Sequence, residues 1–151
     1  MVFKISKKII YAIEAVVDIA YYSGTQPVQN IEIAKRQGIP KRYLEKTLQN
    51  LVKNNILIGS RGPKGGYRLA KERRKIRISD IVNSINDQPA DSFKDKLMVS
   101  EISKKIINPM FINITDSCFN SFEKISIEDI CQKARNENIK KTSSEKVDFV
   151  I

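Results

Sequence analysis

The chain has 151 residues, a formal net charge of +10 at pH 7, no histidine and two cysteines. Its length fits one compact domain, or a small domain with an oligomerisation arm. Histidine is the commonest general base and metal ligand, and two cysteines cannot complete a four-ligand His/Cys zinc site within one chain. The sequence shows no catalytic dyad and no phosphate-loop motif, so we expect that the protein is not an enzyme.

The cysteine content and the absence of a secretory signal fit a reducing cytoplasm. The longest apolar stretch, residues 9–20, is interrupted by Glu14 and Asp18 and is too short to span a bilayer. We therefore expect a cytoplasmic protein with no membrane partner.

The positive charge is concentrated in the first part of the chain. Residues 1–87 contain 17 Lys and Arg against 7 Asp and Glu, whereas residues 88–151 contain 10 of each. This asymmetry indicates a polyanionic partner for the first part, and double-stranded DNA is the natural candidate.

The first predicted element is a helix over residues 6–23. Its apolar residues recur at helical spacing, and Gly24 follows its last turn: Ile9, Ile10, Ile13, Val16, Val17 and Ala20. Glu14 and Asp18 are free to point outward. We expect a core helix whose first lysines could also touch a phosphate backbone.

Two further helices are predicted to form a helix-turn-helix unit. Asn30 caps a short helix over residues 31–37, in which Ile31 and Ala34 share the buried side. The turn Gly38-Ile39-Pro40 leads into a helix over residues 41–54. Its outer face carries long polar side chains that suit base edges and phosphates. On its own, such a polar helix face is more often a solvent-exposed surface than a binding surface.

A glycine-rich basic hairpin follows directly. Apolar strands flank the loop 60–66, which carries Arg61 and Lys64 among three glycines and Pro63. The alternatives are an ordinary basic surface hairpin and the wing of a winged helix. Its position directly after a polar-faced helix favours the wing. Residues 1–87 are thus expected to form a winged helix-turn-helix domain, within a mainly α fold whose only sheet is this small β-hairpin.

The second part of the chain is predicted to be helical after a linker. Ser79 caps a helix that ends near Ile85, and residues 88–107 form a loop. Asn108-Pro109 starts a long helix to about Lys124, and Ser126–Asp129 is the capping box of a last helix that ends near residue 135. Residues 136–151 are expected to be a flexible tail.

The long helix carries an aromatic-rich stripe that needs a partner surface. We expect it to pair with the same helix of a second subunit through the interface residues Phe111, Ile114, Cys118 and Phe122. Residues 108–135 thus comprise a dimerisation helix and a short C-terminal helix. The alternative is packing within the same chain.

These segments together resemble the Rrf-two-type family of bacterial winged-helix transcription regulators. The most specific segment is the run Arg61-Gly62-Pro63-Lys64-Gly65-Gly66-Tyr67-Arg68-Leu69 after a helix-turn-helix. The segments 11–12, 33–34, 38–45, 78–82 and 125–130 match as well, so the resemblance covers residues 3–134.

The resemblance implies a homodimer, most often a repressor, that reads a partly palindromic DNA site. The start of the recognition helix would enter the major groove, and the wing would lie at the neighbouring minor groove. The implied DNA-binding residues are Pro40, Lys41, Arg42, Tyr43, Glu45 and Lys46, with Arg61, Gly62, Pro63 and Lys64 in the wing. Pro40 stands where the family usually has serine, which removes one hydroxyl contact.

The resemblance also implies a sensor that this sequence lacks. Cluster-binding members hold iron through three cysteines in the loop before the long helix. An alignment without gaps places Lys94, Ser100 and Ile106 at those positions, and none is a thiolate. We therefore expect no [2Fe–2S] cluster and no metal site.

Two alternatives remain open at this point. Cys118 and Cys131 lie on apolar helix stripes, where inert core thiols are the usual finding, although a redox switch through Cys118 would also fit. The missing cluster ligands leave the input signal unassigned, so a winged-helix module that binds a protein partner, such as an enzyme, is the alternative to a DNA-binding regulator.

Overall fold

The protein is mostly helical with one two-stranded antiparallel hairpin, as predicted. A computed structural model describes residues 5–86 and 99–141. The elements are α1 Lys7–Tyr22, α2 Asn30–Gln37, α3 Lys41–Lys53, β1 Leu57–Ser60, β2 Gly66–Leu69, η1 Arg73–Lys75, α4 Ile78–Ile85, η2 Ser103–Ile107, α6 Asn108–Glu123 and α7 Ile127–Asn136. Within these residues, no helix is both long enough and apolar enough to cross a membrane.

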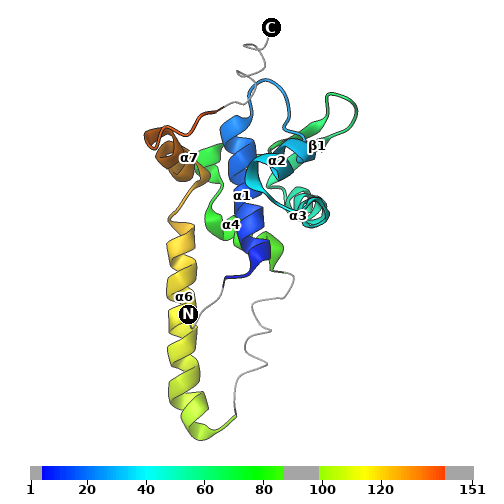
Figure 1. Cartoon of the computed structure of the whole chain (residues 1–151). Coiled ribbons are helices and arrows are strands. Elements are labelled where there is room, and N and C mark those ends of the chain that lie inside the picture. Colours follow the sequence, from blue (N-terminus) through cyan, green and yellow to red (C-terminus); the bar gives the residue numbers. More distant parts are fainter. Residues whose placement is uncertain (1–4, 87–98, 142–151) are drawn as a thin grey trace.

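Helix α1 runs through the centre of the globular part, with α3 and α7 on opposite sides of it (Figure 1). Its buried face is centred on Ala12, Ala15, Val16 and Ile19, which have no exposed surface. The small alanines allow neighbouring helices to approach closely. The apolar face predicted from the sequence is therefore rotated, and Ile10 remains 42% exposed.

The prediction that Asp18 points outward is wrong. Asp18 is 1% exposed, and Arg36 of α2 donates two hydrogen bonds to its carboxylate, of 2.9 and 2.8 Å. Gln37 donates a third, of 2.8 Å. Because a buried carboxylate needs such partners, Asp18 holds the helix-turn-helix unit against α1. The hydrogen bond from Arg36 also raises the pKa of its guanidinium.

Helix α2 begins one residue earlier than predicted. Gln29, not Asn30, is the capping residue, and its backbone N–H donates to the Glu32 carboxylate over 3.0 Å. This start places Ile33 in the core and leaves Ile31 60% exposed, contrary to the prediction for Ile31. Gly38 ends the helix with φ +64°, a conformation that glycine adopts without strain.

Helix α7 packs into the same core as α1 and α4 rather than beside α6 alone. Its side chains Ile127 and Cys131 have no exposed surface. The backbone N–H of Ile78 donates to Ile125, and that of Ile127 donates to Ile76, each over 2.9 Å. The short last helix predicted within residues 108–135 thus completes the core formed by residues 5–86.

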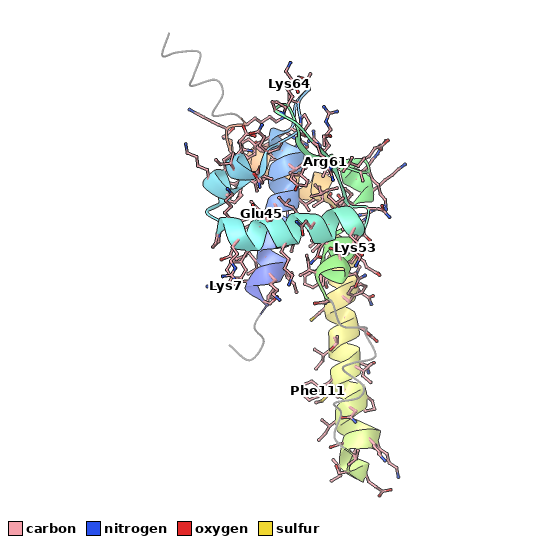
Figure 2. The ribbon with its side chains drawn as sticks, turned by 90° about the vertical axis from the view of Figure 1, so that its right-hand side faces the viewer. Lys7, Glu45, Lys53, Arg61, Lys64 and Phe111 are labelled. Carbon is pink, nitrogen blue, oxygen red and sulfur yellow. The ribbon has the colours of Figure 1, made fainter. Side chains whose placement is uncertain are left out.

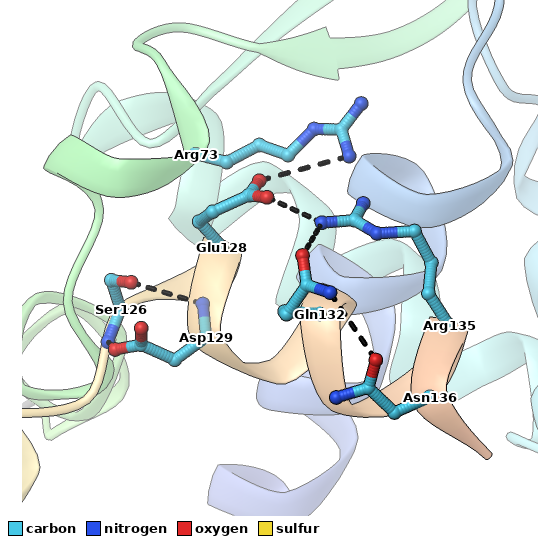
Figure 3. A network of polar contacts seen from close by, with 7 residues as sticks. All are labelled: Arg73, Ser126, Glu128, Asp129, Gln132, Arg135 and Asn136. Atoms are coloured by element: carbon cyan, nitrogen blue, oxygen red, sulfur yellow. Dashed lines mark hydrogen bonds and ion pairs between the residues drawn. The ribbon is translucent and has the colours of Figure 1, made fainter.

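Of the helix caps predicted for α7 and α4, the first is confirmed and the second is wrong. The capping box at Ser126 and Asp129 forms as predicted, through reciprocal backbone contacts of 3.1 and 2.8 Å (Figure 3). At α4, however, the capping residue is Arg77 and not Ser79, because the Asp80 carboxylate accepts the Arg77 backbone N–H. Ser79 itself is buried.

A polar network links η1 to α7. Glu128 lies between Arg73, at 3.9 Å, and Arg135, which also donates to Gln132 (Figure 3). These side chains are partly exposed, so their contribution to stability is small. Arg73, Glu128 and Arg135 also act electrostatically on the buried thiol of Cys131.

Helix α6 projects away from the globular part as an arm (Figure 1). We expected a loop over 88–107, yet residues 101–107 are already helical, and residues 87–98 lie outside the described part. Asn108 is accordingly no cap. Pro109 has no N–H to donate to the helix. The π-helical turn η2 precedes it, and there the Asn108 N–H donates to the carbonyl of Ser103, five residues back.

The start of the predicted tail folds back on α1. The Tyr21 hydroxyl donates to the Ile139 carbonyl, and the Lys141 ammonium lies 5.7 Å from the Tyr21 ring centroid. Residues 142–151 lie outside the described part, so the prediction of a tail is not tested there.

Candidate nucleic-acid interface

One face of the molecule combines α3, the hairpin and the start of α1. Figure 2 shows α3 crossing this face, with Arg61 and Lys64 of the hairpin above it and Lys7 of α1 below it. All ten predicted DNA-binding residues are exposed: Pro40, Lys41, Arg42, Tyr43, Glu45, Lys46, Arg61, Gly62, Pro63 and Lys64. Exposure of large polar side chains on one face is what contact with a duplex requires.

The opposite face of α3 fixes the position of this helix. Leu44, Leu48 and Leu51 have no exposed surface and pack into the core. Thr47 is buried between them, where its hydroxyl donates to the Tyr43 carbonyl over 2.8 Å. Because these residues fill one stripe, the polar stripe of α3 must face solvent.

The hairpin is short and braced by a third segment. Strands β1 and β2 pair from Leu57 opposite Leu69 to Ser60 opposite Gly66. Val28 adds a further bridge to Tyr67 through backbone hydrogen bonds of 3.0 and 2.8 Å. The sequence did not predict this bracing, because one bridge residue next to Pro27 gives no strand pattern.

The glycines of the loop are required by close backbone contacts. A Cβ at Gly65 would lie 2.3 Å from the Ser60 carbonyl oxygen. A Cβ at Gly66, where φ is +151°, would lie 2.5 Å from the Val28 carbonyl oxygen. Both positions therefore exclude a side chain.

Two side chains hold the loop against the segment before α2. Gln29 donates to the Pro63 carbonyl over 3.2 Å, and Arg68 donates to the Thr25 carbonyl over 2.8 Å. A groove of about 830 Å³ lies between the loop and the helices, and Gln49 and Lys53 of α3 are among its lining residues. The hairpin thus stands at a fixed place above α3.

The face is strongly positive. Lys41, Arg42 and Lys46 form no ion pair with any residue in the described part, nor do Arg61 and Lys64. Glu45 is the one acidic residue in α3. Cations that the protein does not neutralise are available to phosphates.

The predicted sensor positions do not fit an iron–sulfur cluster. Ser100 donates to the Ser103 hydroxyl, Ile106 is a 64% exposed hydrocarbon, and Lys94 lies outside the described part. A hydroxyl, an ammonium and an alkyl chain do not replace three thiolates. No group of three potential ligands gathers anywhere in residues 5–86 or 99–141.

The two cysteines have different surroundings. Cys131 is buried, and burial raises the pKa of its thiol, an effect that nearby Arg73 opposes only in part. Cys118 is exposed on α6 in the single chain. The surroundings of Cys131 thus fit the prediction of an inert core thiol. Cys118, by contrast, is not buried in the core of its own chain.

The fold and this face define a winged helix-turn-helix protein, with α2 and α3 as the helix-turn-helix and β1–β2 as the wing. The model of the Rrf2 family, described as iron-dependent transcriptional regulators, matches residues 5–133. The chain belongs to the Rrf2 family, which confirms the family predicted from the sequence.

Curated relatives match about half of the chain. The transcriptional regulator IscR of Klebsiella pneumoniae strain 342 is 38% identical over 77 residues, which are 51% of this chain and 47% of that protein. A putative regulator, ORF2, of Azotobacter vinelandii is 34% identical over the same shares. The chain thus spans about half the length of the curated relatives it matches. These relatives are transcription regulators and not enzymes.

Solved structures match over nearly the whole chain. IscR of T. potens is 26% identical with a TM-score of 0.75, over 95% of this chain and 96% of that one. CymR of B. subtilis, titled the global cysteine regulator, is 25% identical with a TM-score of 0.70, over 87% and 98%. The winged-helix fold predicted from the sequence is confirmed.

Proposed function

We propose that the protein is a transcription regulator that binds specific DNA sequences as a homodimer and works without an iron–sulfur cluster. The observation that carries the proposal is a positive face on which the exposed polar side of α3 lies below the braced basic wing. Family membership agrees with this function. Such a regulator works where the chromosome is, which favours the cytoplasm.

Eight of the ten predicted residues have an assigned role in the proposal. The first turns of α3 enter the major groove, where the Glu45 carboxylate accepts from a cytosine amino group. Lys41, Arg42 and Lys46 contact phosphates or guanines. Arg61 and Lys64 reach the neighbouring minor groove, and Gly62 and Pro63 keep the wing tip narrow.

The α6 arm supports the homodimer. No residue of α6 is buried in the single chain. An apolar stripe lies along it, formed by Ile107, Met110, Phe111, Ile114 and Cys118. Burial of such a stripe against a second copy would remove it from water. Phe122 differs, because it is half-buried against its own core. We propose residues 101–123 as the dimerisation arm.

Selection of duplexes from a random library by the full chain tests the proposal. We expect enrichment of two related half-sites whose centres lie about one helical turn apart, since the dimer places two recognition helices on one side of the duplex. A folded dimer that enriches no sequence at low salt would contradict it.

A protein-binding module is the second candidate, because the input signal has no assigned ligand. Affinity capture with the full chain, followed by identification of stoichiometric partners, tests it. An enzyme partner together with uniform affinity for all duplexes would favour this candidate over DNA binding.

Cys118, and not Cys131, is the candidate for a redox switch, because its thiol is exposed. On the apolar stripe it would face its mate across the dimer. Mild peroxide followed by a non-reducing gel should then show a linked dimer, and no linkage would remove the switch.

A visible absorption spectrum of anaerobically purified protein tests the cluster-free state, because a brown protein would overturn it.

A further inference from the structure

A second basic hollow lies beside α3, on the side of α1. Lys8 and Tyr11 of α1 line it together with Arg42 and Lys46 of α3, and its volume is about 370 Å³. Tyr43 contributes its ring, whose centroid lies 6.4 Å from that of Tyr11. Ile85 of α4 also lines it. Three elements thus enclose a site outside the groove between wing and helix.

The lining has the chemistry of a phosphate site. Three cations and two phenol groups face the hollow, and none of the lining residues is acidic. Within the described part, neither phenol hydroxyl makes a hydrogen bond and none of the three cations makes an ion pair. Ammonium, guanidinium and phenol are donors that phosphate oxygens accept.

Helix energetics indicate that these charges do not serve stability. Lys7 and Lys8 occupy the first turn of α1, and Lys41 and Arg42 occupy that of α3, while neither turn contains an acidic residue. The positive end of a helix dipole disfavours cations. An anion bound between the two helix starts would relieve the repulsion at both ends.

We propose that this hollow holds a backbone phosphate of the bound duplex, just beyond the base pairs that α3 reads. Lys8 and Tyr11 bind it from α1, and Arg42 and Lys46 bind it from α3. The contact extends the footprint on the side of α3 away from the wing, so each subunit grips the duplex on both flanks. The inference rests on the proposed function.

The variant Lys8→Gln tests the site, with Lys133→Gln as the control that loses the same charge on α7, on the opposite side of α1 from α3. The affinity of each dimer for the selected duplex is measured between 50 and 200 mM salt. One lost phosphate contact per subunit should reduce the slope of log K against log salt by about 0.9 per subunit. The advantage of wild type over Lys8→Gln should thus shrink about three- to fourfold per subunit across this range.

Folding and binding effects are separable in this experiment. Lys8→Gln removes a cation from a helix start, so its melting temperature should be unchanged or higher. Tyr11→Phe keeps the half-buried ring and should weaken DNA binding without changing the salt slope. A neutral methylphosphonate at the contacted phosphate should weaken wild type more than Lys8→Gln, which keeps only the contacts from Tyr11, Arg42 and Lys46.

Two results would overturn the inference. One is a Lys8→Gln slope equal to that of wild type and Lys133→Gln on a duplex that wild type selects. The other is strong binding of inorganic phosphate by wild type without DNA, lost in Lys8→Gln, which would assign the hollow to a free anion. A wild type that selects no duplex would instead contradict the proposed function.

Discussion

Gly66 shows at the residue scale how the backbone constrains the wing. We expect Gly66→Ala to destabilise the protein by about 1–3 kcal/mol, because a Cβ would meet the Val28 carbonyl and because φ is +151°. The displaced wing should also weaken DNA binding. Thermal melting and a binding titration measure the two effects.

Gly24→Ala is the matched control for this substitution. Nothing lies within 4 Å of a Cβ at Gly24, and its φ lies outside the range that only glycine favours. Its melting temperature and affinity should equal those of wild type. Equal melting of Gly66→Ala and Gly24→Ala would contradict the account of the braced wing.

Asp18 is the residue on which the placement of α2 depends. Asp18→Asn should cost about 3 kcal/mol of unfolding free energy, at the low end for a broken buried pair, because the Arg36 side chain keeps 20% exposure to water. Urea denaturation measures it. In the control Glu72→Gln, the exposed pair with Arg74 is lost and the midpoint should not move. Equal midpoints for both variants would refute a structural role of Asp18.

The proposed function of the arm depends on a second chain. Ile114→Asp places a charge in the apolar stripe, so the dimer should dissociate in sedimentation experiments at micromolar concentration. Asn120→Asp makes the same charge change on the far side of the helix and should leave the dimer intact. A dimeric Ile114→Asp protein would show that another surface pairs the chains.

The two thiols report on the same element. In the native dimer Cys131 should stay unmodified by a thiol reagent, since it is buried with a raised pKa, until denaturant exposes it. Cys118 should react faster in the Ile114→Asp monomer than in the wild-type dimer, where the stripe covers it. Equal Cys118 rates in the two proteins would argue against its place in the interface.

Local patterns predicted the helices and the hairpin, because period and turn residues are written in short stretches. The contacts that organise the elements were less predictable. Asp18 looks like a surface residue by spacing, and only the meeting of α1 with Arg36 makes it a buried one. The capping roles of Gln29 and Arg77 depend on carboxylates three residues on, which compete with the more typical caps Asn30 and Ser79.

The candidate site was predictable to a similar extent. The order of helix, loop and glycines predicted ten DNA-binding candidates, and the structure leaves all ten exposed. Val28, Gln29 and Thr25, which hold the wing, were missed because they lie in an extended segment with no pattern. The one available signal for this bracing was Val28, a hydrophobic residue directly after Pro27 that lies far in the sequence from both strands.

At the scale of the whole molecule, residues 1–87 carry the net positive charge, and residues 88–151, which include the α6 arm, carry none. The excess charge of residues 1–87 lies mainly with α3, the wing and residues 71–77, whereas α6 carries the apolar stripe. Division of charge and hydrophobicity between the two parts suits a dimer that places two positive faces on one duplex.

The most direct test of this account is the affinity of the Arg61→Ala dimer for the selected duplex and for a shuffled duplex of the same length. We predict that wild type prefers the selected duplex and that Arg61→Ala loses about 1–3 kcal/mol on it, because Arg61 leads the wing. Arg61→Ala should lose much less on the shuffled duplex. Equal wild-type affinity for both duplexes, or an Arg61→Ala protein that discriminates as well as wild type, would contradict the central claim.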